Sequence, residues 1–206
     1  MDSGSQVSQI EQVPVTMGGF GVNVYIIHAP GGDIIVDAGA EPEKILAAIK
    51  EPVAAILVTH GHADHIGALE DIRGATQAPV HMHPDDAEPA GITGYEPFQD
   101  GQDLVIAGEM IHVIHTPGHC PGSVTLVISE DQVVGDLIMP GSVGRTDIGG
   151  AKWEDLEVSI RKVMPLWTEN TRLYAGHGDV MHALSEMKSN PYLPPVLPSA
   201  PTSSAP

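Results

Sequence analysis

Short apolar runs alternate with segments of helical spacing along most of this chain. Val22–His28 and Ile34–Val36 are rich in β-branched residues, and Pro30-Gly31-Gly32 between them predicts a hairpin. Val53–Thr59 is apolar almost without interruption, which is typical of a strand buried on both faces. We expect the remaining strands at Pro79–His83, Leu104–Ile106, Met110–His115, Ser123–Ile128, Gln132–Val134 and Arg172–Ala175.

Helices are expected where apolar residues recur every three or four positions. In Pro42–Lys50, proline occupies the first turn, and Ile45, Leu46 and Ile49 share one side. The order of strands and helices fits an α+β fold with two sheets and helices on their outer faces. The other predicted helices span Ala63–Ile72, Trp153–Met164 and Val180–Lys188.

The middle of the chain shows no internal repeat and no linker, so we expect one domain over residues 10–193. Residues 1–9 are expected to be flexible. Residues 194–206 are rich in Pro, Ser and Ala and are expected to be disordered. The N-terminus lacks the basic and apolar stretches of a signal peptide, and no apolar run approaches the roughly 18 residues of a membrane span. We therefore expect a cytoplasmic protein that does not enter a membrane.

The chain is strongly acidic, with 27 Asp and Glu residues against 9 Lys and Arg residues and a net charge of −18. Such a surface repels phosphate backbones, so nucleic acid is excluded as an expected partner. Cys120 is the only cysteine, which excludes an internal disulfide framework and Cys-rich zinc sites. The 11 histidines point instead to a metal bound by imidazole and carboxylate groups.

The densest group of candidate ligands follows the apolar strand, in Thr59-His60-Gly61-His62-Ala63-Asp64-His65. His60 and His62 are two residues apart, so an extended turn can point both imidazoles at one ion. Asp64 and His65 lie on the following helical turn and can face a second ion beside the first. A polar loop with an N-capping aspartate is the alternative. Four ligand-type residues in six positions after a buried strand favour the metal site.

Three further candidates lie at strand ends farther along the chain. His119 lies in the turn Thr116–Ser123, Asp136 follows the strand that ends at Gly135, and His177 stands between two glycines. Each alone would be an ordinary turn residue. Together they supply the ligands that the first motif lacks, and each is presented by a loop on a rigid strand, where catalytic groups tend to lie.

Taken in order, these motifs resemble the metallo-β-lactamase superfamily from about Val13 to Leu193. The pattern is HxHxDH, TPGH, GD and GHG, preceded by the aspartate of Val36-Asp37-Ala38-Gly39 after an early strand. Gly144-Arg145-Thr146-Asp147 is similar to the short type II glyoxalases and to the persulfide dioxygenases. The ending Glu186–Leu193 is similar to the close of the short glyoxalase-like branch. The resemblance implies a four-layer αβ/βα sandwich, the metallo-β-lactamase fold.

The resemblance also implies which residues hold metal. Two divalent metal ions are expected. Zinc is the first choice, and iron and manganese are the alternatives. Asp136 would bridge both ions, and Asp64 would also pass a proton to the leaving group. Asp37 would orient the loop of the first two histidines from outside. A hydroxide shared by the ions would be the nucleophile, because bound water ionises near neutral pH. The first ion would be held by His60, His62 and His119, and the second by Asp64, His65 and His177.

For the substrate, the resemblance implies a small thioester, in particular an S-(2-hydroxyacyl)glutathione. Arg145 is the candidate for binding a substrate carboxylate, because guanidinium holds carboxylates bidentately. An internal ion pair between Arg145 and Asp147 is the alternative. Full-length type II glyoxalases add a C-terminal helical domain that grips glutathione, and that domain is not expected here. The protein is expected to be a monomer or a homodimer.

Another reaction class is open on the same residues. A persulfide dioxygenase would use one iron held by His60, His119 and Asp136, a triad of two histidines and a carboxylate with open positions for oxygen. Hydrolysis of a lactone or a β-lactam is a further alternative. A metal-binding protein without activity is disfavoured by the complete ligand set. Metal content and oxygen consumption separate these classes.

Cys120 directly follows a predicted ligand. On an extended segment its side chain would point away from the metal and pack against its neighbours. His81 and His83 alternate along a short strand and share a face, either as ordinary histidines or as an accessory metal contact. Gly91–Phe98 is expected to cover the core or to flank the substrate entrance.

Overall fold

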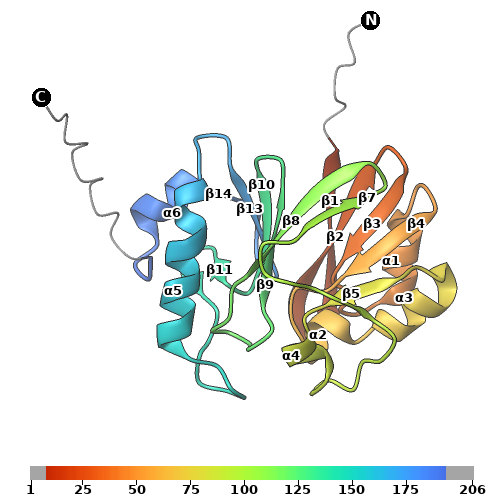
Figure 1. The fold of residues 1–206 in the computed structure, drawn as a ribbon, viewed down its shortest axis with the longest axis horizontal. Coiled ribbons are helices and arrows are strands. Elements are labelled where there is room, and N and C mark those ends of the chain that lie inside the picture. Colours follow the sequence, from red (N-terminus) through yellow and green to blue (C-terminus); the bar gives the residue numbers. More distant parts are fainter. Residues whose placement is uncertain (1–7, 194–206) are drawn as a thin grey trace, which may run out of the picture.

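Two six-stranded sheets pack face to face, and helices cover the outer face of each (Figure 1). The structure is a computed structural model, and it describes residues 8–193. Its layers follow the predicted αβ/βα order. The segments 1–7 and 194–206, which were expected to be flexible and disordered, lie outside the described residues.

The first sheet has the strand order β1-β2-β3-β4-β5-β6. Its first three strands are antiparallel, and β3 to β6 run parallel to one another. The predicted hairpin joins β2 to β3. The strands are β1 (Gln9–Met17), β2 (Phe20–Ala29), β3 (Gly32–Val36), β4 (Val53–Leu57), β5 (Val80–Met82) and β6 (Glu96–Pro97).

The second sheet has the strand order β14-β13-β10-β9-β8-β7. Its strands are antiparallel except for β10 and β13, which run parallel. Its strands are β7 (Asp103–Ile106), β8 (Glu109–His115), β9 (Val124–Ile128), β10 (Asp131–Gly135), β13 (Arg172–Ala175) and β14 (Met181–His182), and a separate two-stranded sheet joins β11 (Ile138–Met139) to β12 (Ser142–Val143).

The helices lie outside the two sheets, with α1 and α3 on the first and α5 and α6 on the second (Figure 1). Between residues 8 and 193, no helix has the length and apolar character that crossing a membrane requires. The helices are α1 (Pro42–Ala48), α2 (Ala63–Ile66), α3 (Leu69–Thr76), α4 (Pro84–Ala87), α5 (Trp153–Val163), the 3-10 turn η1 (Met164–Leu166) and α6 (Ala183–Ser189).

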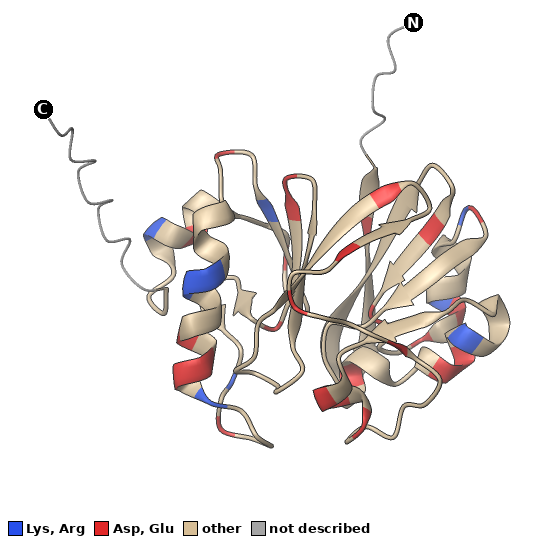
Figure 2. Ribbon diagram, in the orientation of Figure 1, with Lys and Arg blue, Asp and Glu red and all other residues tan. Residues whose placement is uncertain are grey.

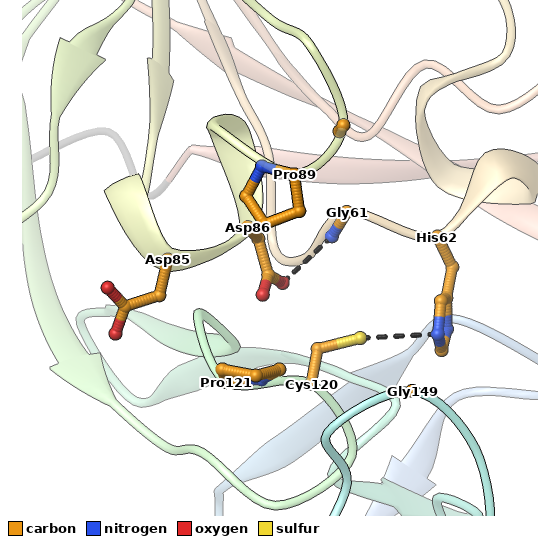
Figure 3. A pocket seen from close by; sticks show the side chains of 9 residues that line it. Gly61, His62, Asp85, Asp86, Pro89, Cys120, Pro121 and Gly149 are labelled. Carbon is orange, nitrogen blue, oxygen red and sulfur yellow. Dashed lines mark hydrogen bonds between the residues drawn. The ribbon is translucent and has the colours of Figure 1, made fainter.

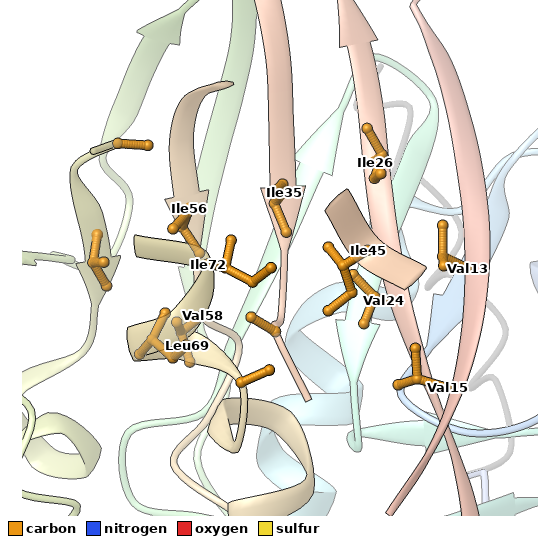
Figure 4. Close-up of a cluster of buried hydrophobic side chains, with 14 of the residues drawn as sticks. Val13, Val15, Val24, Ile26, Ile35, Ile45, Ile56, Val58, Leu69 and Ile72 are labelled. Carbon is orange, nitrogen blue, oxygen red and sulfur yellow. The ribbon is translucent and has the colours of Figure 1, made fainter. Parts of the chain in front are cut away.

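Successive residues of the central strands point to opposite faces, so each strand contributes to two layers of the core. In β2, Val24 and Ile26 pack under the helices of the first sheet (Figure 4). Tyr25 and Ile27 face the second sheet. A third cluster, which includes Leu156 of α5, fills the space between the second sheet and its helices. Burial on both faces explains why these strands are apolar without alternation.

The sequence pattern did not predict β1, which begins at Gln9, a residue expected to be flexible. Val13 and Val15 are its buried residues, and the exposed Pro14 lies between them. Two buried residues give a weak period-two signal in an edge strand. Pairing with β2 along the whole length of β1 decides the structure of this segment.

Two predicted helices are interrupted by long-range backbone contacts. The helix predicted over Ala63–Ile72 breaks at Gly67 into α2 and α3. A Cβ atom at Gly67 would lie 2.6 Å from the carbonyl oxygen of Gly39, so only glycine permits this close approach. The helix predicted over Val180–Lys188 begins instead with β14, which pairs with β13, and α6 follows. Tertiary contacts override helical spacing in both segments.

We expect Ile26→Ala to lower the free energy of unfolding by about 2–5 kcal/mol, because Ile26 is 0% exposed and its loss leaves a cavity. Urea unfolding followed by circular dichroism measures this change. Phe20→Ala is the control, since Phe20 is 75% exposed and its removal should change stability by less than about 0.5 kcal/mol. Equal effects of the two substitutions would contradict this account of the core.

Candidate metal centre

The predicted ligands gather where the carboxyl ends of parallel strands meet. Asp37 follows β3 and His60 follows the adjacent parallel strand β4. Asp136 follows β10 and His177 follows its parallel neighbour β13. His119 lies in the turn from β8 to β9, and two antiparallel pairings carry that turn to the same edge. The topology therefore brings residues from five loops to one place between the two sheets.

The carboxylate of Asp136 lies between two groups of imidazoles. Its Oδ2 atom is 3.4 Å from His119 Nε2 and 3.4 Å from His177 Nε2. Its Oδ1 atom is 3.5 Å from His65 Nε2. On one side, His62 Nδ1 is 2.8 Å from His119 Nε2. On the other side, His177 Nε2 is also 3.4 Å from the Oδ2 atom of Asp64.

Three buried polar atoms within residues 8–193 have no hydrogen-bond partner: His60 Nε2, His65 Nε2 and Asp136 Oδ1. All three belong to this centre. A buried polar atom without a partner is costly, and native structures rarely leave one. Lone pairs of imidazole and carboxylate groups that face each other at these distances fit divalent cations. Among the described residues, groups able to hold an ion here are His60, His62, His119 and Cys120; His60, His65 and Asp136; and Asp64, His65 and His177.

Each of the five imidazoles has a partner at the ring nitrogen that faces away from the centre. Such partners orient a ligand ring and set which nitrogen is free to bind metal. The pairs are His60 Nδ1 with Thr59 Oγ1 at 3.1 Å, His62 Nε2 with Cys120 Sγ at 3.3 Å, His65 Nδ1 with Asp37 Oδ2 at 2.7 Å, His119 Nδ1 with the Arg145 carbonyl oxygen at 2.9 Å, and His177 Nδ1 with the Gly21 carbonyl oxygen at 2.6 Å.

Asp37 lies outside the centre and is almost fully buried. Its Oδ1 atom accepts the Thr59 N–H at 2.7 Å, and its Oδ2 atom accepts the Thr59 hydroxyl at 2.8 Å and the His65 N–H at 2.7 Å. Its backbone has a φ of 59°, a left-handed conformation that is unusual for a residue other than glycine. Asp37 therefore fixes both the start of the HxHxDH loop and one imidazole within it.

The environment of the centre favours neutral imidazoles at His60 and His62, an ionised Asp136 and a protonated His177. Burial lowers the pKa of His60 well below its usual range, and burial also lowers the pKa of His62. Burial alone would raise the pKa of Asp136, but the hydrogen bond from His177 and the surrounding imidazoles hold it far below its usual range. Contacts with Asp136 and Asp64 raise the pKa of His177 to about 11. The carboxylates thus attract positive charge at the place where a cation would bind.

The Cys120 side chain turns toward the ligand His62, which corrects the expectation that it points away from the metal residues. The segment is a tight turn rather than an extended strand, because the Cys120 carbonyl oxygen accepts the N–H groups of Gly118 and Ser123. The turn places Sγ 3.3 Å from His62 Nε2 (Figure 3). Burial raises the pKa of the Cys120 thiol, so the neutral thiol is the stable form and a nucleophilic role is disfavoured.

Arg145 is engaged with Asp147, one of the two alternatives that the sequence left open. Its Nε atom donates to Asp147 Oδ1 at 2.7 Å, and its Nη2 atom donates to Asp147 Oδ2 at 3.0 Å. Both side chains are mostly exposed. Acidic residues are distributed along the whole fold and basic ones are few (Figure 2). The carbonyl oxygen of Arg145 binds His119 Nδ1, while the guanidinium of Arg145 is paired with Asp147.

The remaining histidines of interest do not extend the centre. His83 and His115 lie near Asp85, but their rings are stacked at 4.2 Å with an interplanar angle of 6°. Lone pairs lie in the ring planes, so two nearly parallel rings do not aim them at one ion. His81 stacks on Phe98, which is buried between the sheets. Phe98 therefore covers the core, which is one of the two roles expected for the Gly91–Phe98 loop.

Apart from Asp37, sequence reasoning missed the groups that hold the imidazoles from outside. The carbonyl oxygens of Gly21 and Arg145 carry no side-chain signal. Thr59 begins the segment that holds the HxHxDH motif, and its position directly before a ligand was the one sequence clue to its role.

Two opposed sheets with a centre of histidines and aspartates at one edge are typical of a metalloenzyme. The profile of the metallo-beta-lactamase superfamily matches residues 17–177, and the chain belongs to this superfamily.

Curated relatives cover nearly the whole chain. "Probable metallo-hydrolase YqgX" of Bacillus subtilis is 34% identical over 200 residues, which are 86% of this chain and 94% of the relative. "Hydroxyacylglutathione hydrolase GloC" of Haemophilus influenzae is 31% identical over 209 residues, which are 89% of this chain and 97% of the relative. Each alignment thus spans most of the relative as well as most of this chain.

Solved structures show the same architecture. The BLEG-1 B3 metallo-beta-lactamase is 30% identical, with a TM-score of 0.79 over 90% of this chain and 99% of that chain. TTHA1623, solved in a di-iron-bound form, is 33% identical, with a TM-score of 0.76 over 87% of this chain and 99% of that chain. The metallo-β-lactamase fold predicted from the motifs is confirmed.

We expect Cys120→Ala to weaken zinc binding about tenfold, the lower end of the usual effect of losing a group behind a metal ligand, because a thiol is a weak partner. Competition with a chromogenic chelator measures the affinity. Cys120→Ser is the matched control: its hydroxyl can replace the thiol at His62 Nε2, so affinity should stay close to that of the wild type. If the alanine variant also binds zinc normally, Cys120 serves packing alone.

Proposed function

We propose that the protein is a hydrolase with two metal ions that cleaves a small thioester of the S-(2-hydroxyacyl)glutathione kind. The observation that carries the proposal is the position of Asp136, whose carboxylate faces imidazoles on both sides at 3.4–3.5 Å. A carboxylate so placed suits a bridge between two ions. The likeness to the relative described as a hydroxyacylglutathione hydrolase supports the thioester as substrate.

The donor set assigns ligands to the two proposed ions. His60, His62 and His119 would hold the first, and Asp64, His65 and His177 would hold the second, with Asp136 shared. Imidazole and carboxylate ligands without a committed thiolate are suitable for zinc, iron or manganese, and we propose zinc. Such ions would supply Lewis-acid polarisation of the substrate carbonyl and a water of lowered pKa.

Residues of the chain supply positioning and proton transfer. Thr59 and Asp37 fix the rings of the motif, so the ligand atoms are held in place before an ion arrives. Asp64 is about one-third exposed, and its contact with His177 lowers the pKa of its carboxyl group. An ionised Asp64 at the open side of the centre can accept a proton at Oδ2 and return it to the departing thiolate.

Specificity for glutathione has less support than thioester cleavage. The guanidinium of Arg145, proposed to bind a substrate carboxylate, is paired with Asp147. It would have to exchange partners, and both groups are exposed enough to allow this. The acidic surface disfavours polyanionic partners and agrees with a small substrate.

The first test is metal content together with a substrate panel. Mass spectrometry should find two ions per chain, and S-lactoylglutathione should be hydrolysed without oxygen uptake. A lactone and a β-lactam belong in the panel as competing substrates of the same superfamily. One iron per chain with persulfide-dependent oxygen consumption would replace the proposal by the dioxygenase alternative.

The second test is Asp136→Ala. Loss of the shared carboxylate should lower kcat/KM by more than about 100-fold, since metal-assisted charge stabilisation is worth several kcal/mol, and occupancy should fall at both sites. Asp131→Ala is a matched control at the other end of β10, because Asp131 is also 8% exposed but binds Arg172 instead. Wild-type turnover in Asp136→Ala, or equal losses in both variants, would refute the bridging role.

A further inference from the structure

Asp86 is a buried carboxylate outside the predicted ligand set. It lies in α4, is 5% exposed, and contacts two loops that carry candidate ligands. Its Oδ2 atom accepts the N–H of Gly61 at 2.9 Å, and its Oδ1 atom accepts the N–H of Gly122 at 2.6 Å. Gly61 separates the first two histidines of the HxHxDH motif. Gly122 belongs to the TPGHCPG turn, three residues after the histidine of that turn.

The contact with Gly122 requires glycine on the loop side, and the contact with Gly61 leaves little room for a side chain. A Cβ atom on Gly122 would lie 2.7 Å from the carboxyl carbon of Asp86, and a Cβ atom on Gly61 would lie 3.1 Å from the Cβ atom of Asp86. These distances are too short for another residue without movement. The two glycines of the motifs therefore let one carboxylate bind both backbones directly, and Figure 3 shows the contact with Gly61.

The two loops come from different sheets. The HxHxDH loop follows β4 of the first sheet, and the TPGHCPG turn joins β8 to β9 of the second. Within the described residues, the Val124 N–H also donates to the Thr59 carbonyl oxygen at 2.9 Å and links the same loops. Asp86 adds two hydrogen bonds to an ionisable acceptor, which are stronger than neutral ones. Asp86 binds the loop at Gly61, directly before His62, whereas the Val124–Thr59 bond lies where the loop leaves its strand.

We propose that Asp86 is a positioning residue for the first metal ion: through the peptide groups of Gly61 and Gly122 it sets how His62 stands relative to His119 and Cys120. The inference rests on the proposed metal centre. The contacts that Asp86 would maintain are those of the His62 ring. His62 Nδ1 lies 2.8 Å from His119 Nε2, and His62 Nε2 lies 3.3 Å from Cys120 Sγ.

Asp37 has the same relation to the other half of the centre. It binds the Thr59 backbone and orients His65, which belongs to the second group of ligands. Asp86 binds the Gly61 backbone and fixes the segment that presents His62, which belongs to the first. Asp86 therefore bears on the first group alone, whereas Asp37 bonds directly to a ligand of the second group and reaches His60 of the first through Thr59. Loss of Asp86 should weaken one ion, whereas loss of Asp37 should act most strongly on the other, and this difference is measurable.

The experiment compares Asp86→Asn, Asp86→Ser and Asp37→Asn in the full chain, with Asp85→Asn as the matched control. Asp85 is the neighbour of Asp86 on α4 and borders the same cavity of about 260 Å³, but its carboxylate has no hydrogen bond to either loop. An asparagine at 86 can accept one N–H, while its amide group opposes the other. Zinc titration against a chelator gives the affinity of each ion, and thermal unfolding reports the fold.

Cobalt identifies which site has changed. In the cobalt-loaded protein, ring N–H signals of histidine ligands are shifted in proton NMR spectra. We expect Asp86→Asn and Asp86→Ser to displace the signals of His62 and His119. In the same variants the affinity for one of the two zinc ions should fall about 10–100-fold. The signals of His65 and His177 should stay in place. Asp37→Asn should displace the signal of His65, which loses its direct partner, and Asp85→Asn should match the wild type.

Equal weakening of both ions, or signals of all four histidines displaced together, would overturn the proposal, because a general loss of structure does the same. Normal affinity for both ions in Asp86→Asn and Asp86→Ser would also overturn it. Failure of both Asp86 variants to fold would show that Asp86 holds the fold instead of the site. Since the titration uses zinc alone, it gives its answer whether or not the wild-type protein cleaves thioesters.

Discussion

Five imidazoles and two carboxylates lie together at the junction of the two sheets, and their mutual orientation governs the rest of the structure. An uncompensated buried charge or lone pair is costly, so every such group must meet a partner or a cation. The outward ring nitrogens meet protein partners, whereas atoms of His60, His65 and Asp136 that face inward are left without one. The fold thus satisfies the centre from outside and leaves its interior for ions.

The sheets supply this arrangement through the direction of their strands. Two parallel pairs, β3 with β4 and β10 with β13, end at the same edge and deliver Asp37, Asp136 and most of the histidines. The layers of apolar side chains on both faces of the sheets hold that edge rigid. Rigid strand ends are what a metal centre requires, because ligand atoms must be held in position before the ion binds.

Around the ligands there is an outer layer with a division of roles. Asp37 contacts the second group of ligands, and Asp86 contacts the loops of the first. The exposed acidic surface is separate from this layer, since Asp37 and Asp86 are both buried and bonded to backbone N–H groups. Their charges therefore act on geometry at the centre, while the surface charge acts on partners and solubility.

The sequence by itself determined the ligand types, their spacing and the superfamily, because HxHxDH and the downstream histidines lie at strand ends that apolar runs make visible. It also determined most of the strands, whose burial on both faces is written in their composition. Only the tertiary structure decided the places of Cys120, Asp86 and β1. A turn aims the Cys120 thiol at His62, two glycines admit the carboxylate of Asp86, and pairing with β2 orders β1. These contacts join residues far apart in the chain, and local periodicity carries no information about them.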